Sequence, residues 1–309
     1  MPKVSCRKAF TRTLLEAARK DTKLYAVATD SRGSVTLSDF ADELPGQFLE
    51  LGIAEQNALS IAAGLASVGR NVFAAGPACF LCARGFEQIK VDVAYNRSNV
   101  KVVGVSAGVS YGPLGGTHTA LHDFASLRAL PNIQIYVPSD GVQAAAITKH
   151  LVDFEGPAYL RTGRGDVESI YPEGELFEMG KAKPVRDGTD MTIIACGEMV
   201  WHAKCAAEQL AKNGISVRVL DMFTLKPFDG EAVLAAAGET GAILTVEEHS
   251  VNGGLGELVA RITAENHPVK MKILGFPDEE YKTGGSTALF SHYGLDSAGI
   301  VRAAYSLLR

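Results

Sequence analysis

Short apolar runs alternate with helical segments along the first 160 residues or so. Buried strands are expected at Leu24–Thr29, Asn71–Ala75 and Ile133–Val137, and helices at Glu55–Val68 and Leu121–Leu130. Strands that are apolar on both faces and separated by helices are typical of a parallel sheet covered on both sides. The same pattern places further elements at Phe48–Leu51, Arg84–Tyr95, Lys101–Val105, Asp140 onward and Pro157–Leu160. It predicts an α/β fold.

The alternation stops between about 165 and 185, where Gly, Pro and acidic residues follow no period, and then resumes. The part of the chain after residue 185 is expected to hold a strand at Met191–Ala195 and a helix at His202–Lys212. Strands at Ser216–Leu220, Ala242–Val246 and Val269–Leu274 and a helix at Glu257–Glu265 should follow. A chain of 309 residues fits about two domains. We therefore expect two doubly wound α/β domains, 1–165 and 186–309, joined by a linker at 166–185.

Charge and hydropathy exclude several classes of protein. The net charge is −5 and no basic run stands out, which argues against a nucleic-acid-binding surface. No apolar stretch reaches the roughly 18 residues of a membrane span. The segment Met1–Arg12 is basic but lacks the apolar core of a signal peptide, so a cytoplasmic location is expected.

The five cysteines are an odd set without secretory context, so a disulfide framework is not expected. Cys79 and Cys82 have the CxxC spacing of redox and zinc sites, but no second pair accompanies them. The residues between them are Phe and Leu, rather than the Gly, Pro or polar residues of a redox motif. We interpret this pair as small buried side chains beside a site.

Ligands of open α/β sheets bind beyond the carboxyl ends of the strands, so reactive groups are expected in the loops there. Glu55 follows an apolar strand and begins an apolar helix. A carboxylate withdrawn from water in this way is suited to hold or share a proton near neutral pH. The alternative is a first-turn glutamate stabilised by the helix dipole, and spacing alone leaves both possibilities open.

The glycine-rich loop from Gly108 to His118 follows the strand at 101–105. Such a loop lets the backbone approach a ligand closely and places His118 at the mouth of the sheet. His118 and His122 have the i, i+4 spacing of helical zinc ligands, but there is no HExxH motif and no third ligand, so no metal site is expected. His118 either contacts a ligand or serves as a capping histidine.

Two more motifs follow later strands. Arg161 and Arg164 end the last strand of the first half and form either an anion clamp or a solvated pair. Gly254-Leu-Gly256 lacks the third glycine of a dinucleotide-binding motif. We interpret it as a tight strand-to-helix turn.

Taken in order, these motifs resemble the C-terminal half of the transketolase family. LGIAEQN is similar to the family's G-I-x-E-Q/H motif, and GGTH followed by HDFASLRALPN resembles its DGPTH loop and downstream S-L-R-x-x-P-N. EEHSVNGGLGELV resembles a segment of the C-terminal domain in split transketolases. The resemblance extends over essentially the whole chain. It implies a pyrimidine-binding domain followed by a smaller transketolase C-terminal domain.

The resemblance implies thiamine diphosphate as cofactor. Glu55 matches the family's glutamate that hydrogen-bonds the aminopyrimidine ring and promotes proton transfer within the cofactor. Phe80 and Phe86 lie where the family places aromatic side chains against that ring, although Ala83 replaces the aromatic residue in the middle of the usual pattern. His118 matches the histidine that contacts the donor sugar. Glu55 and His118 are therefore the expected catalytic residues.

Substrate positions follow from the same resemblance. Arg7, Ser34 and Arg164 match positions that hold a sugar phosphate. Two positions depart from the family, because Leu114 replaces an aspartate that recognises a donor hydroxyl and Ser106 replaces a histidine. Losing a buried polar contact rejects substrates that need it, so a non-standard donor is expected. Apulose 4-phosphate, a branched sugar, and a sulfo-sugar are the donors considered.

The resemblance also implies a partner. The family holds the diphosphate and a Mg²⁺ or Ca²⁺ ion with a GDG…N motif in a separate N-terminal domain, and this sequence has no such motif. We expect an N-terminal transketolase subunit as partner, in an α2β2 heterotetramer acting on sugar phosphates. The second domain is expected to serve in packing and assembly. Two alternatives stay open: the β-subunit of a 2-oxo acid dehydrogenase and a catalytically silent scaffold.

Overall fold

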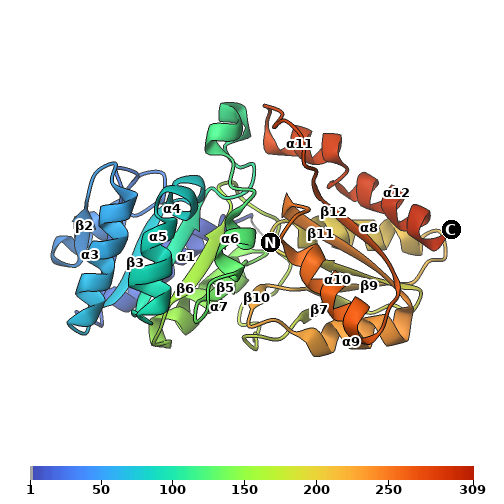
Figure 1. Ribbon diagram of the computed structural model, residues 1–309, viewed down its shortest axis with the longest axis horizontal. Coiled ribbons are helices and arrows are strands. Elements are labelled where there is room, and N and C mark those ends of the chain that lie inside the picture. Colours follow the sequence, from blue (N-terminus) through green and yellow to red (C-terminus); the bar gives the residue numbers. More distant parts are fainter. Residues whose placement is uncertain (1–2) are drawn as a thin grey trace.

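The computed structural model describes residues 3–309. Met1 and Pro2, with which the first expected domain and the basic N-terminal segment begin, lie outside the described residues. Two α/β units lie side by side, the first holding the N-terminal half of the chain and the second the C-terminal half (Figure 1). Each is built on a mostly parallel sheet, so the predicted fold class is confirmed.

The first unit contains a seven-stranded sheet in the order β10-β5-β6-β4-β3-β1-β2. Its strands are β1 (Leu24–Ala28), β2 (Phe48–Glu50), β3 (Asn71–Pro77), β4 (Val100–Val105), β5 (Gln134–Tyr136), β6 (Ala158–Thr162) and β10 (Thr224–Lys226). All neighbours pair in parallel except β10 with β5. Every residue of β3, β4 and β6 is buried, as expected for central strands covered on both faces.

Helices cover both faces of this sheet. One face carries α1 (Cys6–Ala18) and α7 (Gly141–Asp153), whose Phe10 and Ile147 share a hydrophobic core with the strands. The other carries α3 (Glu55–Ser67), α4 (Ala78–Arg84), α5 (Phe86–Gln88), a π-helical turn at Ile89–Tyr95 and α6 (Asp123–Arg128). A short helix α2 (Ser38–Glu43) and a 3-10 turn at Pro45–Gln47 lie between β1 and β2. Asp140 caps α7 by accepting the Gln143 amide at 2.9 Å.

The second unit contains a five-stranded sheet in the order β12-β11-β8-β9-β7. The strands are β7 (Lys183–Arg186), β8 (Met191–Ala195), β9 (Val217–Asp221), β11 (Ala242–Ser250) and β12 (Lys270–Phe276), and only β7 is antiparallel to its neighbour. The helices are α8 (Met199–Ala211), α9 (Gly230–Thr240), α10 (Leu255–Asn266), α11 (Ser286–Tyr293) and α12 (Ser297–Leu308). Residues of α8 and α12 pack in one core with this sheet, while α9 and α10 share another with the first unit.

Strand β10 joins the two units. It belongs by sequence to the second unit but pairs with β5 at the edge of the first sheet. Lys226 of β10 also donates to the carbonyl of Arg128 at 3.2 Å. One hydrophobic core contains residues of both units, among them Phe124, Leu220 and Leu225. The shared strand and core bind the two units into one body.

The sequence located most strands but not every helix. The helix expected at Arg84–Tyr95 begins earlier, at Ala78, and is interrupted at Gly85. A Cβ at Gly85 would lie 2.4 Å from Cδ1 of Leu59 and 2.8 Å from the carbonyl of Leu81, so the close packing of α3 on α4 requires glycine there. The amphipathic helices α1, α9, α11 and α12 and the three-residue β10 were not predicted.

Among residues 3–309 no helix is long and apolar enough to cross a membrane.

Two further expectations concern burial and covalent bonds. Cys79 and Cys82 are both buried in α4, as expected, and all five cysteines are free thiols. Burial raises the pKa of the Cys79 thiol to about 11, which makes it a poor nucleophile at neutral pH.

Candidate active site

Five of the predicted site residues lie in the segments that follow strands of the first sheet. Ser34, Glu55, Phe80, His118 and Arg164 follow β1, β2, β3, β4 and β6, respectively. Because these strands are parallel, the segments after them all begin at the same edge. The topology therefore brings together side chains that are up to 130 residues apart in the sequence.

Glu55 lies in the first turn of α3 and is 2% exposed. Its Oε2 atom accepts from Nη1 of Arg84 at 2.7 Å. The guanidinium carbon of Arg84 in turn lies 5.3 Å from the ring centroid of Phe80. A buried acceptor, a cation and an aromatic ring thus lie together. This set fits a flat heterocycle that stacks on the ring and donates an N–H to the carboxylate.

His118 ends a 3-10 segment, Gly112–His118, and is half-buried between two aromatic rings. Its ring centroid lies 5.3 Å from that of Phe80 and 5.8 Å from that of Tyr111, in edge-to-face geometry with both. Nδ1 of His118 is 2.9 Å from Oγ1 of Thr117. The neighbouring rings restrict the imidazole, and the threonine hydroxyl, which can donate or accept, occupies Nδ1. Nε2 is then the nitrogen left to meet a substrate.

Two arginines lie beside this loop. Nη1 of Arg164 donates to the hydroxyl of Tyr111 at 2.6 Å, and the guanidinium lies 4.7 Å from the same ring. Arg7, in the first turn of α1, donates to the carbonyl of Ser34 at 2.5 Å. Burial, and then the positive charge of Arg164, lower the pKa of Arg7. An anion placed between the two guanidinium groups would relieve their repulsion.

Arg7 and Arg164 line a cavity of about 890 Å³ between the two units. Ser110 lies on the same wall, and the second unit contributes residues including Trp201 and His202. The arginines therefore open onto a space large enough for a small ligand.

Three other predicted residues lie apart from this arrangement. Ser106 is 1% exposed and has a φ of 57°, so its hydroxyl is covered in this chain. Leu114 is 55% exposed, at the outer end of the loop. Phe86 is half-buried against a core that includes Leu59 and Leu81. None of the three makes a ring contact or hydrogen bond to His118 or Glu55 within residues 3–309.

The second unit holds the loop that carries His118. Oε1 of Glu248 accepts from the Val109 amide at 2.9 Å, and the Ser286 hydroxyl donates to the Val109 carbonyl at 3.0 Å. The Gly284 amide donates to the Gly112 carbonyl at 3.2 Å. In Figure 1 the loop rises above the first sheet and lies against the segment that leads into α11. The second unit thus holds the loop of His118 in place as well as packing against the first unit.

Gly108 shows how close this contact is. Its φ is 61°, and a Cβ there would lie 2.1 Å from the carboxyl carbon of Glu248. Only glycine satisfies both the left-handed backbone and the adjacent carboxyl group.

A buried set of charged groups lies beneath the loop. Nε of Arg161 donates to Oδ2 of Asp123 at 2.8 Å, and Nη1 of Arg161 is 3.6 Å from Oε2 of Glu248. The Tyr159 hydroxyl also donates to Oδ2 of Asp123, at 2.8 Å. Burial lowers the pKa of His249, stacked on Phe124, to about 4, so this histidine is neutral at pH 7.

The acid Glu248 makes stability depend on pH. Burial raises the pKa of Glu248 above the value of about 4.3 that it has in an unfolded chain, so folding takes up a proton there. The stability that this proton uptake contributes to the folded state is fully present at low pH. It is lost as the pH rises through the folded-state pKa of Glu248. The wild type should therefore lose stability relative to Glu248→Gln between pH 5 and 8, by up to about 1.4 kcal/mol per pH unit. Urea unfolding of both proteins across this range measures the difference, and parallel curves would contradict the prediction.

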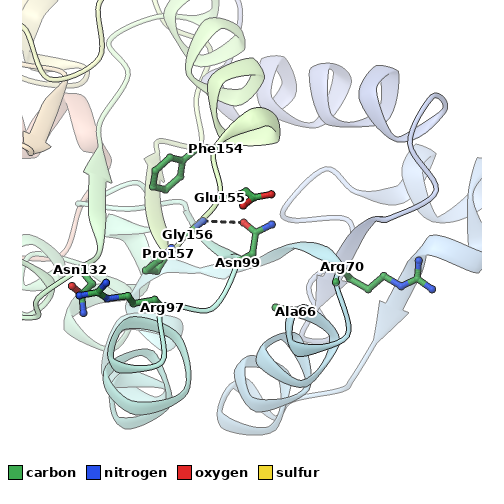
Figure 2. A pocket seen from close by; sticks show the side chains of 10 residues that line it. Ala66, Arg70, Arg97, Asn99, Asn132, Phe154, Glu155, Gly156 and Pro157 are labelled. Atoms are coloured by element: carbon green, nitrogen blue, oxygen red, sulfur yellow. Dashed lines mark hydrogen bonds between the residues drawn. The ribbon is translucent and has the colours of Figure 1, made fainter.

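Another hollow lies at the opposite edge of the first sheet. It has a volume of about 690 Å³, and its lining includes Arg70, Asn99, Asn132 and Pro157. Arg70, Asn99 and Pro157 directly precede β3, β4 and β6, and Asn132 lies two residues before β5. In Figure 2 the Arg70 side chain extends away from the other residues, and Asn99 accepts from the Gly156 amide. This is the amino-terminal edge of the strands, and it holds none of the predicted site residues.

The i, i+4 spacing of His118 and His122, from which no metal site was expected, is not helical in the structure. His118 ends the 3-10 segment, whereas His122 precedes α6, so the two do not share a helix. Within residues 3–309 no group of three or more His, Cys, Asp or Glu residues could hold a metal ion.

Gly254-Leu-Gly256 has the predicted structural role. The segment connects β11 to α10, and Glu247 accepts from the Leu255 and Gly256 amides at 2.6 and 2.8 Å. A buried carboxyl group thus occupies the start of this helix.

Sequence reasoning did not identify Arg84, Tyr111 or Glu248 as parts of the site. Arg84 is four residues after Phe80, and this helical spacing is a usable signal for a cation above a ring. Tyr111 could have been noted as an aromatic residue within a glycine-rich loop. Glu248 gives no comparable signal, because it is 139 residues from its partner Val109.

A buried acid and a histidine-bearing loop at the carboxyl edge of a parallel sheet define an α/β enzyme subunit. Residues 2–169 match the model of the transketolase pyrimidine-binding domain, and residues 180–300 match that of the transketolase C-terminal domain. The chain therefore belongs to the transketolase family.

Similar proteins agree with this assignment. The chain is 53% identical to one of the subunits of apulose-4-phosphate transketolase from Phocaeicola vulgatus, covering 99% of this chain and 98% of that protein. It is 36% identical to mouse transketolase but spans only 49% of that protein. A solved split-gene transketolase, described as an inactive β4 tetramer, superimposes with a TM-score of 0.89 at 37% identity over 99% of both chains. These matches do not favour either of the two alternatives left open by the sequence.

Proposed function

We propose that this chain is the C-terminal subunit of a two-chain transketolase that moves a two-carbon ketol unit from a ketose phosphate to an aldose phosphate. The observation that carries this proposal is the alignment of Glu55, Phe80, His118 and Arg164 along one sheet edge. Such an edge can hold a cofactor ring at one end and a substrate anion at the other. The split relatives support division of the enzyme into two chains.

Thiamine diphosphate is the proposed cofactor, and this chain supplies the pocket for its aminopyrimidine ring. When bound, thiamine diphosphate supplies the electron sink that allows a carbon–carbon bond beside a carbonyl to break and form. Glu55 would accept an N–H of the bound ring and so control its proton, and Phe80 would pack against the ring face. Phe86, half-buried against the core beside α4, is the second aromatic side chain proposed for the ring. We assign the diphosphate and its Mg²⁺ or Ca²⁺ ion to the partner, since no metal-binding cluster occurs in the described part of this chain.

The substrate residues have separate roles in this proposal. Arg7 and Arg164 hold the phosphate, and the Ser34 carbonyl orients Arg7. His118 donates to a hydroxyl or to the oxygen that gains charge near the reacting carbon. Ser106 and Leu114 do not supply the polar contacts that the family pattern has at these positions, which favours an unusual donor. The similarity to a relative named for apulose 4-phosphate supports that branched sugar as the donor.

The assembly and location are part of the same proposal. An N-terminal transketolase subunit completes each site in an α2β2 heterotetramer. The five free thiols are typical of a reducing compartment and support a cytoplasmic location.

Co-expression with a chain carrying the GDG…N motif tests the proposal. The complex should turn over a ketose phosphate and an aldose phosphate, whereas this chain alone should show no turnover with thiamine diphosphate and Mg²⁺. Turnover is followed by mass spectrometry of the product sugars, with apulose 4-phosphate, a sulfo-sugar and xylulose 5-phosphate as separate donors. Turnover by the isolated chain would contradict the need for a partner. A clear preference for xylulose 5-phosphate would contradict the unusual donor.

A further inference from the structure

Tyr111 connects the two functional parts of the substrate site. Its hydroxyl accepts a hydrogen bond from Nη1 of Arg164 at 2.6 Å, and the Arg164 guanidinium also lies 4.7 Å from its ring centroid. The same ring also meets His118, at 5.8 Å and an interplanar angle of 78°. One side chain therefore touches both the proposed phosphate ligand and the proposed catalytic histidine.

The contact with Tyr111 holds the Arg164 guanidinium in place against electrostatic repulsion. Arg7 and Arg164 line the same cavity, and burial and then the charge of Arg164 lower the pKa of Arg7, so the two guanidinium groups repel each other before an anion arrives. Arg164 is only half-buried and could otherwise turn toward solvent. The Tyr111 hydroxyl and ring face keep its guanidinium on the side of the cavity that Arg7 and Arg164 both line.

Tyr111 also restricts the position of His118. His118 lies between Tyr111 and Phe80, with ring centroids 5.8 and 5.3 Å away. Arg164 and His118 therefore share Tyr111 as a packing partner, so the position of Tyr111 bears on both of them. Leu114 carries no polar group and Ser106 is 1% exposed, so neither of these departures from the family pattern offers an accessible hydrogen bond.

We propose that Tyr111 is a positioning residue that selects donors whose phosphate lies at a set distance from the carbonyl end. It acts through Arg164 and His118 rather than on the reacting bond. This inference rests on the proposed function, because it assumes that Arg164 meets the substrate phosphate and His118 the carbonyl end.

Steady-state kinetics of the assembled two-chain enzyme test the role of Tyr111. In Tyr111→Phe the KM of the phosphorylated donor should rise about 10-fold, the effect of one hydrogen bond to a charged group, while kcat changes little. The KM of the same sugar without its phosphate should not change. Tyr305→Phe is the matched control, because it removes a hydroxyl from another half-buried tyrosine, on α12. Equal effects on both donors, or no effect, would overturn the proposal.

Binding of inorganic phosphate provides a readout that needs no turnover. Calorimetric titration of the assembled complex should show binding weakened about 10-fold by Tyr111→Phe, and not further weakened when Tyr111→Phe is added to Arg164→Gln. Independent, additive losses would overturn the coupling between Tyr111 and Arg164. If the wild-type complex binds phosphate in this Tyr111-dependent way but turns over no sugar, the proposed function is wrong and the role of Tyr111 stands.

Discussion

Replacing Glu55 by glutamine should reduce ketol transfer by the assembled enzyme about 10²–10⁴-fold, the range expected when a group that controls a proton is lost. Glutamine has the same shape and retains an acceptor oxygen, but it cannot carry the charge or take up the proton. Glu55 is 2% exposed, so bulk water would compete poorly for that role. The initial rate of product formation with saturating thiamine diphosphate measures the effect.

The controls for Glu55 separate catalysis from folding. Arg84, the ion-pair partner of Glu55, has a side chain that is 49% exposed, so water can solvate it after the substitution and stability should change little. Size-exclusion chromatography with light scattering should show an unchanged complex. Glu231→Gln, at a side chain that is 87% exposed in α9, is the matched control and should keep full activity. Activity of Glu55→Gln close to that of wild type would refute the assignment.

Replacing Arg161 by methionine should lower the free energy of unfolding by about 3–5 kcal/mol, because it leaves the buried carboxylate of Asp123 without its partner. Arg161 is 5% exposed and lies between Asp123, at 0%, and Glu248, at 3%. Methionine fills similar space but cannot compensate the carboxylate of Asp123. The Glu248 carbonyl would also lose the hydrogen bond that Nη2 of Arg161 donates at 2.7 Å. Urea unfolding followed by circular dichroism measures the loss.

A surface pair provides the comparison for Arg161. Nη2 of Arg218 lies 2.6 Å from Oε2 of Glu239, where the side chains are 20% and 59% exposed. Arg218→Met should therefore cost about 1 kcal/mol or less. Adding Asp123→Asn to Arg161→Met should restore part of the lost stability, since one uncompensated charge is removed. A similar loss for Arg161→Met and Arg218→Met would contradict the importance of burial.

Local patterns were sufficient for much of the fold. The apolar runs at β1, β4 and β8 were located to within about a residue, because a strand buried on both faces has few polar residues to confuse its boundaries. Asp140 was identified as a helix cap from its position, and its carboxylate does accept the Gln143 amide. The strand β10 was missed, because three residues carry no period and its partner β5 is about 90 residues away.

Some residues of the candidate site could also be identified from the sequence, whereas others could not. Glu55 and His118 follow strands and belong to motifs that can be read along the chain, so the sequence was enough to single them out. Their neighbours Arg84 and Tyr111 depend on how α4 and the loop of His118 fold back over the sheet edge. The anchoring of that loop by Glu248 depends on the packing of one unit against the other.

Buried strands and helix starts leave local patterns in the sequence. These patterns were enough to predict two α/β units with mostly parallel sheets, and an acid and a histidine after strands of the first unit. Three-dimensional packing was needed to establish that Arg164 meets Tyr111, that Arg84 pairs with Glu55, and that the second unit holds the loop of His118. Most of these contacts join residues far apart along the chain. They exist only once parallel strands have brought their ends to one edge and β10 has joined the two units.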